Sequence, residues 1–388
     1  MRHLMKPVVL SAVIAILELS SAAIAGAQNQ AANALYLSAG KIPTNISGVY
    51  TYPEPPSNFR PLTATNEELA SYGFPTRPDK QADPDHYALW ERAMTAAKHR
   101  WNGELKPLRI DRGASTGPAL EQAQEQLSPA ATTGPIRANN TQASGVLLNN
   151  GLTYWSSTTS FDDIWSVITV PVTQLPFDNT TGCTGSEYWS MSLVGIDGYR
   201  NASLFQPEEA VGVLQRINCP QTWTDNSAVF GWEEAFEIAF SLNPGDVFYT
   251  EVHAFGNCNN GSAFIEDLTT LTYNAYTISN PCSTLQHGRT ANWIVYRPPF
   301  GNKDQIVGGN SPLANTLEIS FEGAEALNTS GTAFYPGSQA TSTVVMTMGE
   351  DTNTEAIELI NQGSSGFQGL HSLLFQTTGC AYTGGCNP

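Results

Sequence analysis

Apolar and polar positions alternate along most of this chain, and that alternation is typical of β-strands. In residues 189–206, Trp189, Met191 and Leu193 share one side of such a stretch, and serines fill the positions between them. The pattern predicts a strand with one face buried. An Asp-Gly pair at 197–198 follows the apolar run and predicts a hairpin turn into a short return.

Similar stretches continue from residue 143 to the C-terminal part of the chain. Turns rich in Gly, Asn and Pro separate them. Many short strands joined by such turns predict an all-β fold, an antiparallel β-sandwich. Further strands are expected at 146–154, 164–172, 228–240, 247–255, 262–267, 270–278, 292–296, 316–321 and 341–348.

The chain before residue 143 has a different pattern. Residues 28–85 are rich in Pro, Asn and Ser, and we expect irregular structure there with one short helix near 66–72. Residues 103–143 read as a polar linker.

One clear helix is expected between these two parts, over residues 84–101. Tyr87, Trp90, Met94 and Ala97 recur at helical spacing. Asp85 is placed to cap the first turn.

The N-terminus predicts export. Arg2 and Lys6 precede an apolar run from Val8 to Leu19, and small residues suited to signal cleavage follow at 23–27. A membrane anchor is the alternative, but the run is shorter than the roughly 20 residues that a span requires. We therefore expect a signal peptide at 1–27, an N-terminal extension or propeptide at 28–143, a β-sandwich domain at 144–388, and a secreted protein without a membrane partner.

Charge is divided unevenly along the chain. Residues 1–144 hold 13 Lys and Arg against 12 Asp and Glu, whereas residues 145–388 hold 5 against 23. So acidic a domain argues against nucleic acid as a partner. Because carboxylates repel one another less as they protonate, the composition suggests acid working conditions, although solubility alone also explains it.

The six cysteines all lie after residue 182. In an exported protein an even number predicts disulfides. Sequence neighbours suggest the pairs Cys183–Cys219, Cys258–Cys282 and Cys380–Cys386. No Cys-x-x-Cys motif occurs and the histidines are scattered, so we expect neither a metal nor another cofactor.

Two segments carry a resemblance to a known family. Residues 194–198, Val-Gly-Ile-Asp-Gly, are followed after a short return by Gln206, and residues 290–295 read Thr-Ala-Asn-Trp-Ile-Val. Together they resemble the glutamic peptidases, the G1 family or eqolisins, whose second segment reads Asn-Ala-Glu-Trp-Ile-Val. The resemblance covers roughly residues 145–375. It implies two curved sheets of concanavalin A-like or jelly-roll type, with a long cleft that takes a polypeptide.

The resemblance also implies a catalytic pair. In the family, Glu is the general base and Gln stabilises the developing oxyanion. Gln206 can fill the second role, but Asn292 stands where the family has Glu. An amide has no proton to exchange in the accessible pH range. The sequence therefore predicts impaired or atypical peptide hydrolysis.

Other groups near this pair are candidates for a support role or for a substitute base. Residues 230–234 resemble a family strand in which Glu233 takes the place of a Glu, next to Trp232. Asp197 belongs to the first matching segment. The plainer interpretation is that Glu233 is a structural hydrogen-bonder in the cleft.

The basic segment 92–112 invites a further comparison with the family, whose members often carry a basic propeptide on an acidic mature domain. Residues 28–143 are then either a propeptide held by charge and lost in acid, or an extension that stays. Two functions remain open for the domain itself. One is an acid endopeptidase with an altered catalytic pair, and the other is a non-catalytic protein, expected to be a monomer, that binds peptides or carbohydrates.

Overall fold

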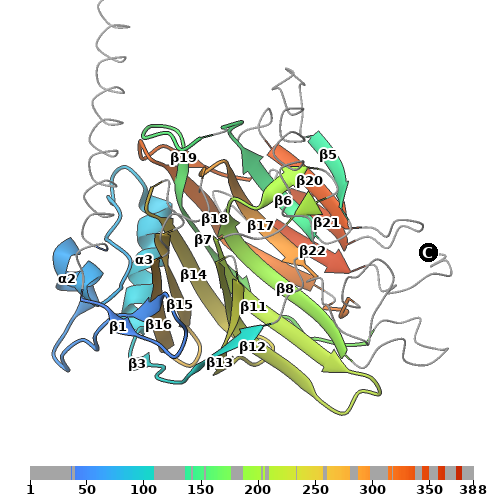
Figure 1. The fold of residues 1–388 in the computed structure, drawn as a ribbon, viewed down its shortest axis with the longest axis horizontal. Helices are drawn as coiled ribbons and strands as arrows, with labels where there is room; N and C mark the ends of the chain where they lie inside the picture. Colours follow the sequence, from blue (N-terminus) through green and yellow to red (C-terminus); the bar gives the residue numbers. More distant parts are fainter. Residues whose placement is uncertain are drawn as a thin grey trace, which may run out of the picture.

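The computed structural model describes the greater part of the chain. The described residues are Tyr36 and residues 40–108, 136–140, 143–152, 154–175, 187–201, 204–205, 209–232, 234–256, 260–279, 287–297, 313–316, 318–336, 343–348, 357–362 and 373–377. They form two large, mostly antiparallel sheets packed face to face, with helices beside one of them (Figure 1). The predicted β-sandwich is confirmed.

The larger sheet, sheet A, has eleven strands within the described residues. Its central path runs β1 (Ile42–Pro43), β2 (Val49–Thr51), β16 (Thr272–Ser279), β15 (Asn260–Asp267), β14 (Val247–Ala254), β7 (Phe161–Thr169), β18 (Glu318–Asn328), β22 (Leu373–Thr377) and β21 (Ile357–Gln362). Off this path, β3 (His99–Arg100) pairs with β16 and β19 (Ala333–Phe334) pairs with β18.

The second sheet, sheet B, has nine strands within the described residues. Their order is β4 (Leu105–Leu108), β13 (Glu234–Ser241), β12 (Thr224–Trp232), β11 (Glu209–Asn218), β8 (Glu187–Ile196), β17 (Thr290–Tyr296), β6 (Ala143–Asn149), β20 (Thr343–Met348) and β5 (Ile136–Asn140). A separate ribbon joins β9 (Tyr199–Asn201) to β10 (Leu204–Phe205).

Apolar side chains of both sheets fill the space between them. In β17 the odd-numbered side chains belong to this core, whereas Ile294 and Tyr296 belong to a separate cluster on the outer face of sheet B. The indole N–H of Trp293 donates to the carbonyl of Trp165 in sheet A at 3.2 Å, which ties the two layers together. Side chains thus alternate between the two faces along residues 291–296, which places Asn292 on the outer face.

Three predictions about strands are wrong. Residues 228–240 are not one strand but parts of β12 and β13, which pair with each other. The expected hairpin at 197–198 does not form, because β8 pairs with β11 and β17 and the return strand β9 pairs with β10. The serines of β8 are as buried as its apolar residues, since sheet A covers their face.

Both expected helices are present, as α2 (Asn66–Ser71) and α3 (Pro84–Ala96). Helix α3 ends five residues before its predicted end, because the N–H groups of Lys98 and His99 turn to the carbonyl of Leu271 and the chain joins sheet A as β3. Its cap is Asp83 rather than Asp85, with the Asp83 carboxylate accepting from the N–H of His86 at 3.0 Å. Of the four residues at helical spacing, Trp90 and Met94 are buried, whereas Tyr87 and Ala97 are partly exposed.

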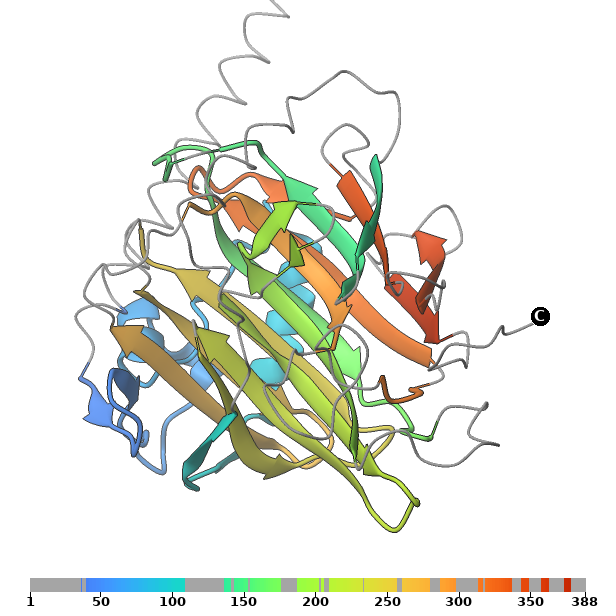
Figure 2. The ribbon, with the colours of Figure 1, turned by 45° about the vertical axis from the view of Figure 1, so that its right-hand side comes forward.

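Tyr36 and residues 40–108, which also include the 3-10 helix η1 (Pro61–Thr63), form a layer that we call the cover. Tyr52, Phe74 and Trp90 of the cover are buried against Trp165 and Tyr249 on the outer face of sheet A. In Figure 2 the cyan helix α3 lies behind the strands of the sandwich. The helices of the cover are thus packed on the outer face of sheet A, whereas its last strand, β4, pairs with β13 at the edge of sheet B. One ion pair between charged side chains joins the basic segment to the sandwich among the described residues, from Lys106 to Glu237 at 3.9 Å.

No helix within the described ranges is long and apolar enough to cross a membrane. Cys219, just after β11, is disulfide-bonded. The other five cysteines lie outside the described residues, so the three proposed pairings stay predictions.

Candidate functional site

Asn292 lies in the middle of sheet B, on the outer face. Its strand neighbours are Gly195 in β8 and Leu147 in β6. Gly195 has no side chain, so the Asn292 amide has room to turn along the strands toward Asp197. The Asn292 side chain is nonetheless buried, with 2% of its surface exposed.

A hydrogen bond fixes the orientation of the Asn292 amide. Its Nδ2 donates to the backbone carbonyl of Asp197 at 2.6 Å. A carbonyl only accepts, so the nitrogen must face it and Oδ1 must face away. Oδ1 is buried and has no hydrogen-bond partner among the described residues. Asn292 therefore offers one acceptor atom to any group that reaches this part of the sheet.

Asp197 holds the turn that begins directly after β8. Its backbone has the left-handed conformation, φ +60°, which Asp tolerates better than most residues. Its carboxylate accepts four backbone N–H groups, from His287 at 2.9 Å, Gly288 at 2.8 Å, Arg289 at 2.6 Å and Thr290 at 3.3 Å. Because both oxygens already have two donors each, Asp197 has the geometry of a structural support rather than of a base that receives a proton.

Gly288 allows the 287–290 segment to wrap around that carboxylate. Its φ is +59°, and a Cβ added there would lie 2.5 Å from the carbonyl oxygen of Phe161. Any other residue would meet both backbone strain and a steric clash. The segment then leads directly into β17, so the Asp197 interactions also set the position of Asn292.

The other predicted site residues are Gln206, Glu233 and Trp232. Gln206 and Glu233 lie outside the described residues, as does the side chain of Trp232. The strands around them do meet in one row across sheet B, in which Trp232 pairs with Glu209, Glu209 with Ile196, and Ile196 with Ala291. The strand ends next to Gln206 and Glu233 in the sequence therefore lie near the start of β17, where Asn292 is.

A charged cluster that sequence reasoning missed lies toward the other end of the same outer face. Arg216 forms ion pairs with Asp225 and, at 3.0 Å, with Glu237. Its guanidinium also lies over the ring of Trp189, 5.1 Å from the centroid. The pairing of β11 with β12 places Arg216 opposite Asp225, so a correct prediction of that register would have revealed the cluster. Two carboxylates already neutralise this cation.

Asn292 and Asp197 can hold and orient a bound group. The Asn292 amide cannot take up a proton, and the Asp197 carboxylate is fully occupied by N–H groups. Among the described residues no carboxylate is hydrogen-bonded to Asn292.

Comparison with known proteins assigns the domain. The model of the Peptidase A4 family matches residues 149–364, which include Gln206, Glu233 and Asn292. A comparison with curated protein sequences gave no match.

Several solved structures are similar to this chain. Scytalido-glutamic peptidase with a transition state analog inhibitor is 16% identical, with 61% of this chain and 98% of that chain covered and a TM-score of 0.45. SCP-B, a member of the eqolisin family in a complex with the tripeptide Ala-Ile-His, is also 16% identical, with the same coverage and a TM-score of 0.39. Aspergilloglutamic peptidase from Aspergillus niger is 22% identical, with 49% and 99% covered and a TM-score of 0.38. Because the family match spans more than half of the residues of this chain, the chain belongs to the Peptidase A4 family, the glutamic peptidases or eqolisins.

Proposed function

We propose that this protein is a secreted glutamic-peptidase homologue in which Asn292 replaces the general base, so that peptide-bond hydrolysis is impaired or atypical. One observation carries the proposal. The Asn292 amide donates to the Asp197 carbonyl at 2.6 Å, a contact that an ionised carboxylate cannot make because it has no hydrogen to donate.

The expected loss follows from the chemistry of the step. A general base positioned at the attacking water contributes roughly 10²–10⁴-fold to the rate of such reactions. Gln206 still offers a donor to the developing oxyanion, so we expect a weak activity that depends on Gln206. A substitute base, with Glu233 as the first candidate, would raise that residual activity.

Cleavage of a denatured protein between about pH 2 and 6, around and below the usual carboxyl pKa values, tests the proposal. Four proteins are compared: wild type, Gln206→Ala, Asn292→Glu and Asn292→Gln. Gln and Glu have the same length and shape, so the last two variants differ only in the ability to exchange a proton. We expect wild type to be slow, Asn292→Glu to gain activity, and Asn292→Gln to gain none.

Two results would change the conclusion. Rapid cleavage by wild type that is lost in Gln206→Ala would mean that another base is in place, and Glu233→Gln would then be the next variant. Inert wild type and inert Asn292→Glu would favour the second candidate function, in which the cleft holds a peptide or carbohydrate without cutting it. The Oδ1 of Asn292, which has no hydrogen-bond partner among the described residues, is the acceptor that supports this second function.

Export belongs to the same proposal. Residues 1–27 carry the features of a signal peptide, and removal of that segment would leave the cover and the sandwich in the mature protein. Expression of the full chain in a secreting host, followed by N-terminal sequencing of the medium fraction, tests it. Retention of the chain in the membrane fraction would favour the anchor instead.

A further inference from the structure

The cover lies outside the segment matched by the family and hides an unusual set of acidic side chains. Sheet A presents Asp163 from β7, Glu251 and His253 from β14, Glu266 from β15 and Glu325 from β18. Each of these residues has at most 8% of its surface exposed. Burial of so many carboxyl groups is costly unless each is paired or holds a proton.

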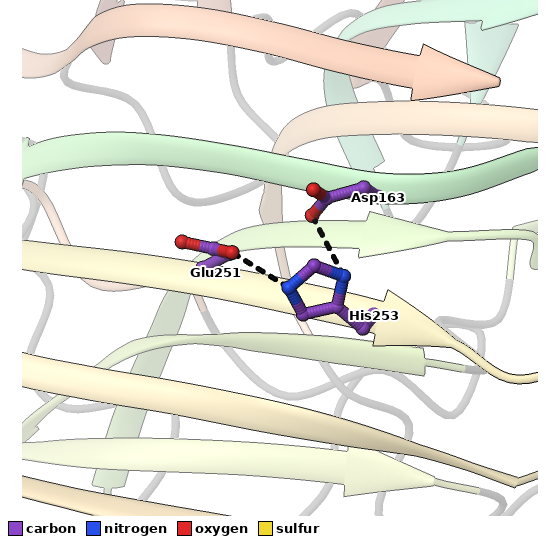
Figure 3. A group of neighbouring side chains, drawn as sticks. All are labelled: Asp163, Glu251 and His253. Atoms are coloured by element: carbon purple, nitrogen blue, oxygen red, sulfur yellow. Dashed lines mark hydrogen bonds and ion pairs between the residues drawn. The ribbon is translucent and has the colours of Figure 1, made fainter. Parts of the chain in front are cut away.

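Three of these residues form one cluster (Figure 3). The imidazole of His253 lies between two carboxylates, with Nε2 2.7 Å from Glu251 Oε1 and Nδ1 3.3 Å from Asp163 Oδ1. Tyr249 donates its hydroxyl to Glu251 as well. From the cover, the ring of Tyr36 lies 5.2 Å from the ring of His253, and the Tyr36 hydroxyl donates to the Phe74 carbonyl at 2.7 Å.

The cluster offers the ligand types of a metal site, but its geometry favours a proton. A metal ion needs its donor atoms to converge on one point. Here the two ring nitrogens of His253 each face a different carboxylate, so the ring itself separates Asp163 from Glu251. Such an arrangement suits hydrogen bonds from each side of the ring to a separate carboxyl group.

The charge balance of this cluster changes with pH. Burial works to raise the pKa of Glu251, but the hydrogen bond and charge of His253 outweigh it and leave that pKa lowered. Burial, with the charges of Glu251 and Asp162, raises the pKa of Asp163 well above its usual range. The Asp163 carboxyl group therefore keeps its proton in mild acid, and its ionisation at higher pH places a second negative charge beside Glu251 in a buried site.

A second proton-holding contact crosses the boundary between the cover and the sandwich. The carboxyl groups of Asp83, at the start of α3, and of Glu325, in β18, lie within hydrogen-bond reach. Two carboxyl groups can bond only while one of them keeps its proton. Burial, followed by the nearby Asp83, raises the pKa of Glu325 to about 9. Burial tends to raise the pKa of Asp83, but its hydrogen bond with His86 outweighs this and the pKa is lowered.

Glu266 is the third member of the set. Both of its carboxyl oxygens are buried without a hydrogen-bond partner among the described residues. In the register of the sheet it lies between Tyr249 and Tyr273. Burial and the neighbouring Asp267 raise its pKa well above the usual range.

We propose that the cover is attached to sheet A through protons held by buried carboxyl groups, so that it is locked in mild acid and loosens as the pH rises. Of the two alternatives for the N-terminal segment, this opposes a propeptide that is lost in acid, and it does not depend on whether the sandwich is catalytic. The titratable and charged groups at or next to this boundary are Asp162, Asp163, Tyr249, Glu251, His253, Glu266, Asp267, Tyr273, Glu325 and Tyr335 from the sandwich, and Tyr36, Tyr52, Glu54, Asp83, Asp85, His86 and Arg100 from the cover.

The sign follows from linkage between protonation and folding. Asp163, Glu266 and Glu325 have raised pKa values, so their contribution is full below about pH 4 and is lost as the pH rises toward their folded values. Asp83 and Glu251 have lowered pKa values, so their contribution is lost only as the pH falls below about 4. Attachment should therefore be strongest near pH 4 and should weaken toward pH 9.

Amide hydrogen exchange of the full chain, corrected for the intrinsic effect of pH, tests the proposal. In wild type we expect the opening of α3 to increase about tenfold or more between pH 5 and pH 8, while β17 changes much less, since one pKa unit is worth a factor of ten. Glu325→Gln should flatten this dependence, because an amide donates to Asp83 at every pH. Glu322→Gln removes a charge from an exposed position of the same strand and serves as the control.

Equal protection of α3 at the two pH values in wild type would overturn the proposal. Identical pH profiles for Glu325→Gln and Glu322→Gln would overturn it as well. The wild-type measurement stands alone should Glu325→Gln fail to fold.

Discussion

Buried carboxyl groups have opposite surroundings on the two outer faces of the sandwich. On sheet B, the carboxylate of Asp197 receives four backbone N–H groups. On sheet A, Glu266 has no donor among the described residues, and Glu325 faces another carboxyl group. A carboxyl group that is surrounded by donors is stable in the ionised form, whereas one without donors is stable only when it keeps its proton.

This difference predicts that the turn on sheet B is stable over a range of pH, whereas the contact between sheet A and the cover changes with pH. The Asp197 turn positions β17 and Asn292 through four N–H groups that donate to one carboxylate. Attachment of the cover combines apolar contacts and strand pairing with the proton-dependent contacts proposed above. Substitutions at each face should therefore differ both in size and in their dependence on pH.

The largest effect is expected for Asp197→Ala. It leaves four N–H groups without their acceptor, and an unsatisfied buried donor costs about 1–3 kcal/mol. Even with partial rehydration we expect a loss of about 3 kcal/mol or more in the free energy of unfolding, measured in urea. Glu318→Ala removes an exposed carboxylate and is the control. A loss no larger than that of the control would contradict the structural role of Asp197.

The next effect is expected for Asn292→Asp. The new carboxylate faces the Asp197 carbonyl without a hydrogen to donate, which should cost about 1–3 kcal/mol at neutral pH. The cost should shrink in acid, because the protonated carboxyl group can donate again. Urea unfolding at pH 4 and pH 7 measures both values, and equal losses at the two pH values would argue against the assigned hydrogen bond.

On sheet A the sign should reverse for Glu266→Met, an apolar replacement of similar length. We expect the variant to be more stable than wild type at pH 8 by at least about 1.4 kcal/mol, the equivalent of one pKa unit. At pH 4 the gain should be small, because the wild-type carboxyl group is then protonated in both states. Thermal unfolding at both pH values measures these differences, with Glu322→Met at an exposed position as the control. A Glu266→Met variant less stable than wild type at pH 8 would contradict the prediction.

The smallest effect is expected for Tyr36→Phe. It removes the hydroxyl that donates to the Phe74 carbonyl but keeps the ring beside His253. A loss of about 0.5–1.5 kcal/mol should follow, with little dependence on pH. A strong pH dependence of this loss would instead connect the Tyr36 hydroxyl to the acidic cluster.

Local patterns in the sequence were sufficient where the structure depends on neighbours in the chain. The strand expected at 292–296 is present within β17, and the short helix α2 lies where it was expected. The end of α3 was missed because the carbonyl that receives Lys98 and His99 belongs to Leu271, far along the chain.

The chemistry of both faces depends on partners that are distant in the sequence. The donors to the Asp197 carboxylate begin 90 residues later, at His287. Asp163 and His253 meet only because β7 and β14 are paired. No spacing rule applied to one segment can find such groups. The resemblance to a family identified Asn292, but it suggested for the cover only attachment by opposite charges and gave no sign of the buried carboxyl groups.

The pairing of the cover with both sheets has a consequence for solubility. Strand β2 pairs with β16 at one margin of sheet A, and β4 pairs with β13 at the corresponding margin of sheet B. A chain cut after β4 and stripped of the cover would expose the unpaired N–H and C=O groups of β16 and β13 together. Exposed edge strands of this kind recruit other chains and aggregate. The cover therefore also protects these edge strands from pairing with other chains, and the first sign of its loss would be precipitation of the protein.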